Sequence, residues 1–138
     1  MSLWLLVLGA AHGQEYRFPA DDAQVQHWYP TAYKDQGGRD WNCGSIRYNG
    51  HRGSDFGGGG FAGMDAGRTV RAAAPGIVAT VVDGEFDRCT TADCPGGGGF
   101  GNYVRLDHPD GRSTFYAHLK KWSIQVAEGD AVPCGGVL

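Results

Sequence analysis

The alternation of hydrophobic and polar positions predicts short β-strands in the second half of the chain. Ile77–Val82 is rich in β-branched residues and ends at Asp83-Gly84. Two further runs, Tyr103–Asp107 and Ser113–Leu119, flank the segment His108–Arg112. Its proline presets φ and its glycine accepts a positive φ, so the two runs predict an antiparallel hairpin.

Three shorter runs predict additional strands. Thr69–Ala72 ends shortly before Pro75-Gly76, while Ile124–Val126 and Ala131–Val132 flank a turn of the type Glu-Gly-Asp. No stretch keeps apolar residues at i, i+3, i+4 and i+7 long enough to predict a helix. The pattern therefore predicts an all-β fold of short antiparallel strands joined by long glycine-rich loops, of which Phe86–Gly99 is the longest.

The first 39 residues have a different pattern. Leu3–Ala11 is apolar but too short to span a bilayer, and small residues follow it, so residues 1–13 predict a secretory signal peptide. A buried strand or short helix is the alternative, because no basic residue precedes the apolar run. Residues 14–39 carry aromatic side chains without a period and predict an irregular lead-in. Residues 40–138 are left as the folded domain, in a protein that is secreted or periplasmic.

Composition and charge argue against two classes of binding partner, nucleic acids and anionic membranes. The chain has 138 residues, with 12 Lys and Arg against 15 Asp and Glu, for a net charge of −3. This balance gives no electrostatic case for binding nucleic acid or an anionic membrane surface. The 24 glycines follow no three-residue period, so they indicate sharply bent loops and not collagen. The sequence does not indicate an oligomeric state.

Four cysteines in a small exported chain predict two disulfides, for which three pairings exist. Cys89 and Cys94 flank a short loop and form the natural local pair. That choice leaves Cys43 to pair with Cys134, which would tie the start of the domain to its end. A cysteine-rich metal site is the weaker interpretation, since the four cysteines are scattered and no C-x-x-C pair occurs.

His51 and Asp55 are the first residues that indicate metal chemistry. An imidazole and a carboxylate are both good zinc ligands, and four positions separate them here. On a straight strand they would share a face about 13 Å apart. Both therefore reach one ion only if the chain bends between them, which Gly53 permits. A solvated loop is the alternative for this pair, and His118, at the end of a predicted strand, is by itself an ordinary structural histidine.

Four ordered segments resemble the lysostaphin (LytM) type of zinc endopeptidase. Gly50–Phe56 resembles the motif H-x-G-x-D-F/Y, and Val70–Val78 resembles V-x-A-x-x-x-G-x-V. Gly101–His108 followed by Thr114–Leu119 is similar to G-N-Y-V-x-x-x-H followed by T-x-Y-A-H-L, and Val126–Cys134 is similar to the turn V-x-x-G-D-x-V. The resemblance implies a LytM/lysostaphin-like domain of the barrel-sandwich hybrid type over residues 40–138.

The same resemblance implies a role for three residues. His51 and Asp55 correspond to zinc ligands, and His118 corresponds to the catalytic imidazole that activates water or stabilises the oxyanion. Zn²⁺ is the implied cofactor, although other divalent ions suit the same ligand types. Family substrates are peptide cross-links or stems of bacterial peptidoglycan, which an exported enzyme meets. We therefore expect a zinc-dependent endopeptidase of peptidoglycan peptides, with Phe86–Gly99 as one wall of its substrate groove.

One element of the family pattern is missing. The remaining zinc ligand belongs to an H-x-H motif that would lie beyond Leu138, and the other histidines, His12, His27 and His108, do not replace it. We therefore interpret residues 40–138 as a domain that is incomplete at its C-terminus, either a truncated reading of a longer protein or a degenerate relative. With two protein ligands, we expect the 138-residue chain to bind zinc weakly and to have little or no peptidase activity.

Two other functions compete with this interpretation. A non-catalytic cell-envelope module, which binds the wall or activates wall hydrolases, is the main alternative. Retention of His51, Asp55 and His118 favours the enzyme, because such modules tend to lose these residues. A swinging-arm carrier domain has similar strand and turn motifs, but it needs a lysine at a hairpin tip, and Lys34, Lys120 and Lys121 are not so placed.

Overall fold

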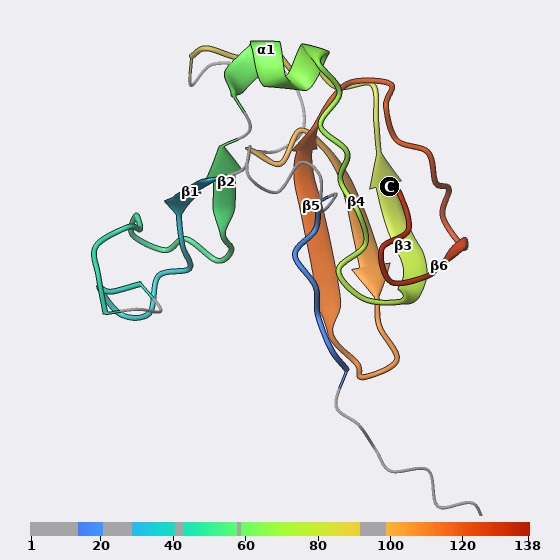
Figure 1. Ribbon diagram of the computed structural model, residues 1–138, viewed down its shortest axis with the longest axis horizontal. Coiled ribbons are helices and arrows are strands. Elements are labelled where there is room, and N and C mark those ends of the chain that lie inside the picture. The colour runs from blue at the N-terminus through green and yellow to red at the C-terminus, as the bar shows by residue number, and fades with distance from the viewer. Residues whose placement is uncertain (1–13, 21–28, 41–42, 58, 92–98) are drawn as a thin grey trace, which may run out of the picture.

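A computed structural model of the chain describes residues 14–20, 29–40, 43–57, 59–91 and 99–138. Strands predominate and the one helix among these residues is six residues long, so the predicted all-β class is confirmed. That helix is too short to cross a membrane. The predicted signal peptide lies outside the described residues. In chain order the elements are β1 (Tyr29–Ala32), β2 (Asp55–Gly57), α1 (Gly60–Asp65), β3 (Gly76–Val82), β4 (Asn102–Asp107), β5 (Ser113–Leu119) and β6 (Ala131–Val132) (Figure 1).

The main sheet has the strand order β5-β4-β3-β6, and each neighbouring pair is antiparallel. The predicted hairpin is the β4–β5 pair. Its turn is closed by His108 N, which donates to Arg112 O at 2.9 Å, and by Gly111 N, which donates to His108 O at 3.0 Å. Gly111 has a φ of 80°, the left-handed conformation for which glycine was expected.

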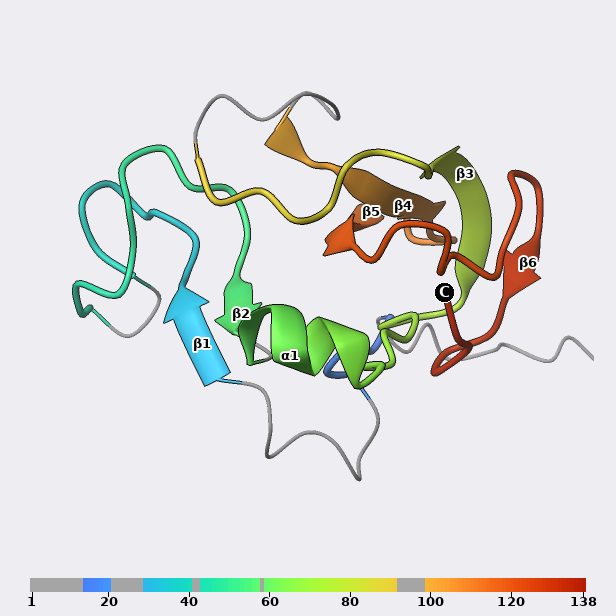
Figure 2. The same ribbon diagram turned by 90° about the horizontal axis from the view of Figure 1, so that it is seen from above.

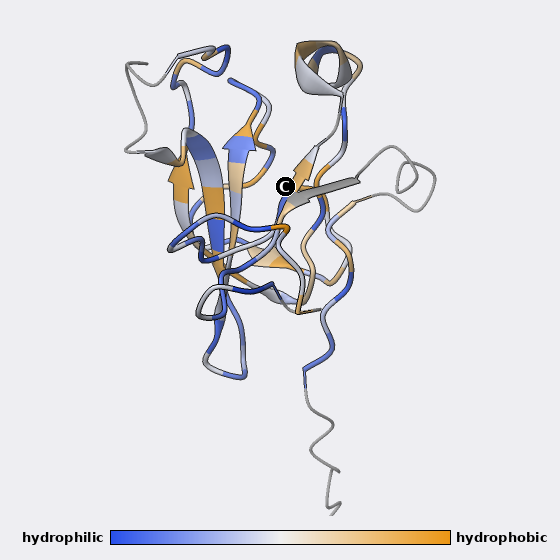
Figure 3. Cartoon of the chain, turned by 90° about the vertical axis from the view of Figure 1, so that its left-hand side faces the viewer, coloured by the Kyte–Doolittle hydropathy of each residue, from blue (hydrophilic) through white to orange (hydrophobic). Residues whose placement is uncertain are grey.

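The inner face of this sheet forms the hydrophobic core. Along β4, Val104 and Leu106 are fully buried at 0% exposure, and Val78 of β3 is buried beside them. The strands alternate between hydrophobic and hydrophilic positions, as Figure 3 shows. Burial of each such aliphatic side chain stabilises the fold by about 1.5–3 kcal/mol. Ile124 and Val126 pack against the core without forming the strand that we predicted for Ile124–Val126, so that prediction is wrong.

A smaller two-stranded sheet, β1–β2, lies to one side of the main sheet (Figures 1 and 2). The two strands are antiparallel and pair Tyr29 with Gly57 and Ala32 with Asp55. Helix α1 follows β2 and lies at the end of the main sheet where β5 ends. The sequence pattern predicted neither β1 and β2 nor α1, and β1 lies inside the segment that we interpreted as irregular.

The segment before β1 also contacts the main domain. Arg17 N donates to Ala73 O at 2.8 Å, Arg71 N donates to Pro19 O at 3.1 Å, and Ala20 forms an isolated bridge with Val70. The predicted strand Thr69–Ala72 is therefore reduced to isolated bridges. The boundary at residue 40 between the lead-in segment and the folded domain remains a prediction.

The predicted Cys43–Cys134 disulfide is wrong, because both thiols are free in the structure. Cys43 lies in the turn before β2. That turn is held by the buried Asp40 carboxylate, which accepts hydrogen bonds from Gly44 N at 2.7 Å and Ile46 N at 3.0 Å. Cys134 lies beyond β6, where its Sγ donates to Ala73 O at 3.5 Å. Cys94 falls outside the described residues, so the Cys89–Cys94 pair remains a prediction.

Candidate metal centre and groove

His51 and Asp55 meet at the start of β2. The chain bends at Gly53 and brings His51 Nε2 to 3.2 Å from Asp55 Oδ1. A straight strand would hold the two residues about 13 Å apart. The bend expected at Gly53 is therefore present, and a helix does not form there.

The environment of His51 Nε2 fits a metal ligand. This nitrogen is buried and makes no hydrogen bond, although the Asp55 oxygen is only 3.2 Å away. Two atoms that carry lone pairs repel each other at this distance unless a proton or a cation lies between them. Two ligand atoms at tetrahedral zinc, each about 2.0–2.1 Å from the ion, are about 3.3 Å apart. The residues present thus fit one edge of a zinc site.

Tyr48 is the residue of this cluster that the sequence did not reveal. Its ring lies on the His51 imidazole, with centroids 4.2 Å apart and planes inclined by 36°. Partial burial, followed by the charge and hydrogen bonding of the Asp55 carboxylate, raises the pKa of Tyr48. The phenol therefore remains protonated and can donate to Asp55.

Asp35 holds the loop that leads into His51. Its carboxylate accepts hydrogen bonds from Gly38 N at 2.8 Å and Gly50 N at 3.1 Å, while its own N–H donates to His51 O at 2.8 Å. The Gly38 and Gly50 amides, with a smaller contribution from Arg47, lower the pKa of Asp35. The lead-in segment therefore positions the backbone on both sides of Gly50.

His118 lies at the end of β5 in an unusual conformation. It is exposed, and its φ of 56° is in the left-handed region, which non-glycine residues rarely adopt. Its N–H donates to Phe100 O at 3.0 Å. His108, by contrast, is buried, with Nδ1 2.8 Å from Pro75 O and Nε2 2.8 Å from Thr114 Oγ1. Its two ring nitrogens thus join the hairpin turn to Pro75 and to Thr114.

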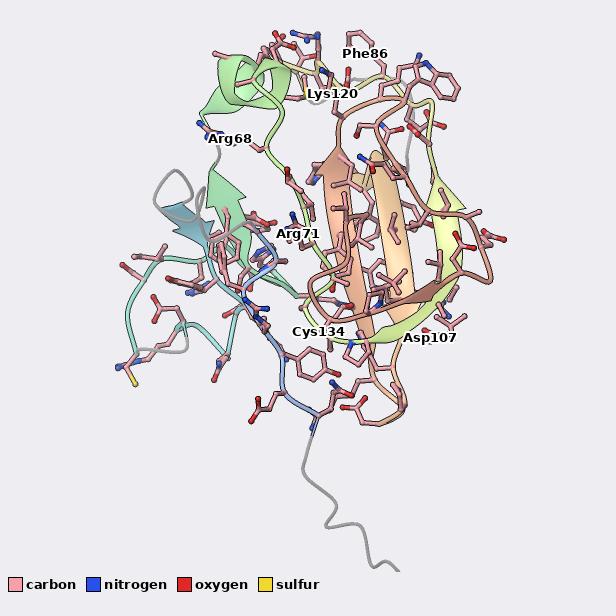
Figure 4. The ribbon with its side chains drawn as sticks, turned by 45° about the vertical axis from the view of Figure 1, so that its right-hand side comes forward. Arg68, Arg71, Phe86, Asp107, Lys120 and Cys134 are labelled. Carbon is pink, nitrogen blue, oxygen red and sulfur yellow. The ribbon has the colours of Figure 1, made fainter. Side chains whose placement is uncertain are left out.

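A groove of about 520 Å³ lies between β2, α1 and the end of β5. One side is formed by β2 and α1, through Phe56 and Phe61, and the other includes His118 at the end of β5. Asp87, from the described part of the predicted Phe86–Gly99 loop, also lines it. Figure 4 shows Arg68 and Lys120, two charged residues of the lining, at the end of the sheet near α1, far from Asp107.

Two contacts link α1 to the loop after β3. Asp65 of α1 forms an ion pair with Arg88, whose guanidinium lies 5.5 Å from the centre of the Phe61 ring. The hydrogen bond between the two side chains lowers the pKa of Asp65 and raises the pKa of Arg88. These contacts set the distance between α1 and the loop that carries Asp87.

The structure brings His51 and Asp55 together but does not add a third ligand. Among the described residues, no group of three or more His, Cys, Asp and Glu side chains is arranged to hold a metal ion. His118 is thus separate from the pair. Asp55 is followed directly by Phe56, which lines the same groove as His118. The candidate catalytic imidazole therefore lines the groove directly, and the candidate ligand pair is next to it in sequence through Phe56.

A comparison with models of protein families identifies the family of the chain. The model of peptidase family M23 matches residues 49–138, which is more than half of the chain and includes His51, Asp55 and His118. The chain belongs to peptidase family M23, and the predicted resemblance to lysostaphin (LytM)-type enzymes is confirmed. Membership implies peptidase activity at the level of the family. Searches of curated proteins and of solved structures found no significant match.

Proposed function

We propose that this protein is a zinc-dependent endopeptidase that cleaves peptide cross-links or stems of bacterial peptidoglycan outside the cytoplasm. The observation that carries the proposal is the buried Nε2 of His51, which has no hydrogen-bond partner and lies 3.2 Å from Asp55 Oδ1. Phe56, the residue after Asp55, lines the groove. Family membership supports the reaction class.

We assign metal binding to residues before and in β2, and proton transfer to a residue at the end of β5. His51 and Asp55 would hold the zinc ion, and Tyr48 would keep the imidazole and the carboxylate in place. When bound, zinc supplies Lewis-acid chemistry, which polarises a peptide carbonyl and makes water a better nucleophile. His118 is exposed and near neutral pH an imidazole both accepts and donates protons, so it would carry the proton to the leaving amine.

The described residues offer two protein ligands for zinc. We therefore expect weak zinc binding and little or, at most, slow turnover by this chain, because structural and catalytic zinc sites normally have three or four protein ligands. The assay must therefore use saturating zinc and long incubation.

The test incubates the full chain with purified peptidoglycan, with zinc or with a chelator, and follows newly formed amino groups by mass spectrometry. We expect slow fragment release that requires zinc and is lost in His51→Ala, Asp55→Asn and His118→Ala. Zinc binding, measured separately, should persist in His118→Ala. Asp107→Asn, which removes an exposed carboxylate at the far end of the sheet, is the matched control and should behave as wild type.

Two results would count against the proposal. Hydrolysis that survives a chelator or His51→Ala would exclude the zinc mechanism. Binding to peptidoglycan that needs neither zinc nor His51, without any fragment release, would favour the alternative of a non-catalytic cell-envelope module.

A further inference from the structure

The pairing of β4 with β5 is irregular at His118. Val104 pairs with Tyr116 and Asn102 pairs with Leu119, so β5 advances three residues where β4 advances two. The extra residue forms a β-bulge at Ala117 and His118, and His118 takes the left-handed φ of 56°. Bulges re-aim a side chain and are frequent beside active sites, although the left-handed position usually holds glycine.

Asn102 closes this bulge from the opposite strand. Its side chain is 1% exposed, and its Nδ2 donates to Leu119 O at 3.1 Å. The same amide donates to Glu85 O at 3.1 Å and accepts from Glu85 N at 2.8 Å. One buried amide therefore joins the residue after His118 to the loop that carries Asp87 into the groove.

Phe100 and Gly101, which precede β4, also contact the bulge. Phe100 O accepts the His118 N–H at 3.0 Å. Gly101 lies against the imidazole, since a Cβ at this position would be 3.8 Å from His118 Nδ1. The strained conformation is thus held at His118 N by Phe100 and one residue later by Asn102. Such strain persists only where the surrounding structure fixes it.

We infer that Asn102 is a positioning residue for His118, which it holds in the bulged, left-handed conformation that directs the imidazole into the groove. Through Glu85, Asn102 also fixes the groove wall relative to that imidazole. That Asn102 holds the backbone conformation of His118 follows from the hydrogen bonds of the Asn102 amide alone. The consequence for catalysis rests on the proposed function of His118.

The first measurement is NMR spectroscopy of the full chain and of Asn102→Ser. In the wild type we expect left-handed backbone chemical shifts at residue 118 and an NOE from the His118 ring to the Gly101 Hα protons. Asn102→Ser should shift the residue 118 signals toward ordinary β values and weaken that NOE at least three-fold. Thr114→Val, which also removes a partly buried hydrogen-bonding side chain from the hairpin, is the matched control and should leave both signals unchanged.

The second measurement separates positioning from simple packing. With Asn102 in place, His118→Gly should have an unfolding constant about three-fold lower than His118→Ala, because glycine adopts the left-handed conformation without strain. The advantage of glycine should disappear when Asn102→Ser is added, since the bulge can then relax. If Asn102 only fills space, glycine would keep the same advantage in both backgrounds.

Unchanged His118 signals in folded Asn102→Ser, or an equal advantage of glycine in both backgrounds, would overturn the inference. Relaxed His118 signals together with a lost advantage would establish it. The peptidoglycan assay of His118→Ala is independent: if that variant cleaves as well as wild type, the proposed role of His118 fails while the NMR result still decides the role of Asn102.

Discussion

Tyr116→Phe tests whether a single buried hydroxyl fastens β5 to the segment that precedes β3. Tyr116 is 7% exposed, and its Oη accepts a hydrogen bond from Ala73 N at 2.7 Å. The same oxygen is 2.9 Å from Thr114 Oγ1. Burial raises the pKa of Tyr116, so the group remains a neutral phenol throughout the working pH range.

The expected cost follows from the partners that lose the hydroxyl. Ala73 N is buried, and a buried amide left without a partner costs about 1–3 kcal/mol. Thr114 loses a neutral hydrogen bond, worth about 0.5–1.5 kcal/mol, but retains His108 as a partner. We therefore expect Tyr116→Phe to lower the free energy of unfolding by about 1.5–4.5 kcal/mol, with no further loss from packing, since the aromatic ring stays in place.

Urea denaturation followed by tryptophan fluorescence measures this change. The m-value should stay constant, and hydrogen exchange at the Ala73 amide should accelerate in parallel. Tyr103→Phe is the matched control, because Tyr103 is on the neighbouring strand and its hydroxyl makes no hydrogen bond within the described part of the chain. A loss below about 0.5 kcal/mol, or equal losses in the two variants, would refute the reasoning.

Two other substitutions test the loop before β2 and the start of β3. The pKa of Asp35 is lowered from 3.8, so its carboxylate stabilises the fold above that pH, and the contribution is lost as the pH falls through the lower folded value. Asp35→Asn should therefore speed hydrogen exchange at the Gly50 amide at pH 7, and equal exchange in variant and wild type at pH 7 would contradict this. Gly76→Ala should lower the free energy of unfolding by about 1–3 kcal/mol, because the new Cβ would be 2.8 Å from Asp107 O and 2.9 Å from His108 Nδ1. An unchanged melting temperature would contradict this, because it would mean that β3 and β4 move apart at this position without cost.

The elements that the sequence predicted correctly depend on local signals. The β4–β5 hairpin is encoded by its alternating strands and by a turn with Pro109 and Gly111 in the required places. β3 follows from a run of β-branched residues. Each of these elements is specified by neighbours in the chain, so no knowledge of distant contacts was needed.

The elements that the sequence did not predict depend on distant contacts. β1 and β2 are four and three residues long, and they pair across a loop of more than twenty residues. α1 begins after Gly59 with no side-chain cap, and glycine is a poor helix former, so its local sequence argues against it. Ile124 and Val126 were mistaken for strand residues because burial in a core without strand pairing produces the same apolar pattern.

The candidate site was predictable in part for the same reason. His51, Gly53 and Asp55 are close in sequence, and the bend between them could be argued from glycine alone. Tyr48 and Asn102 could not be assigned roles, because their partners, the Asp55 carboxylate and the Leu119 carbonyl, are identified only by the fold. The Cys43–Cys134 pair came from counting cysteines, which carries no information about the distance between their thiols.

The most direct test of the central claim is zinc K-edge X-ray absorption spectroscopy of the full chain loaded with one equivalent of zinc. The account predicts a first shell of nitrogen and oxygen atoms at about 2.0–2.1 Å, with imidazole scattering that is lost in His51→Ala. A shell dominated by sulfur at about 2.3 Å would show that the cysteines bind the ion. That result, or imidazole scattering that persists in His51→Ala, would contradict the assignment of His51 and Asp55 as the zinc ligands.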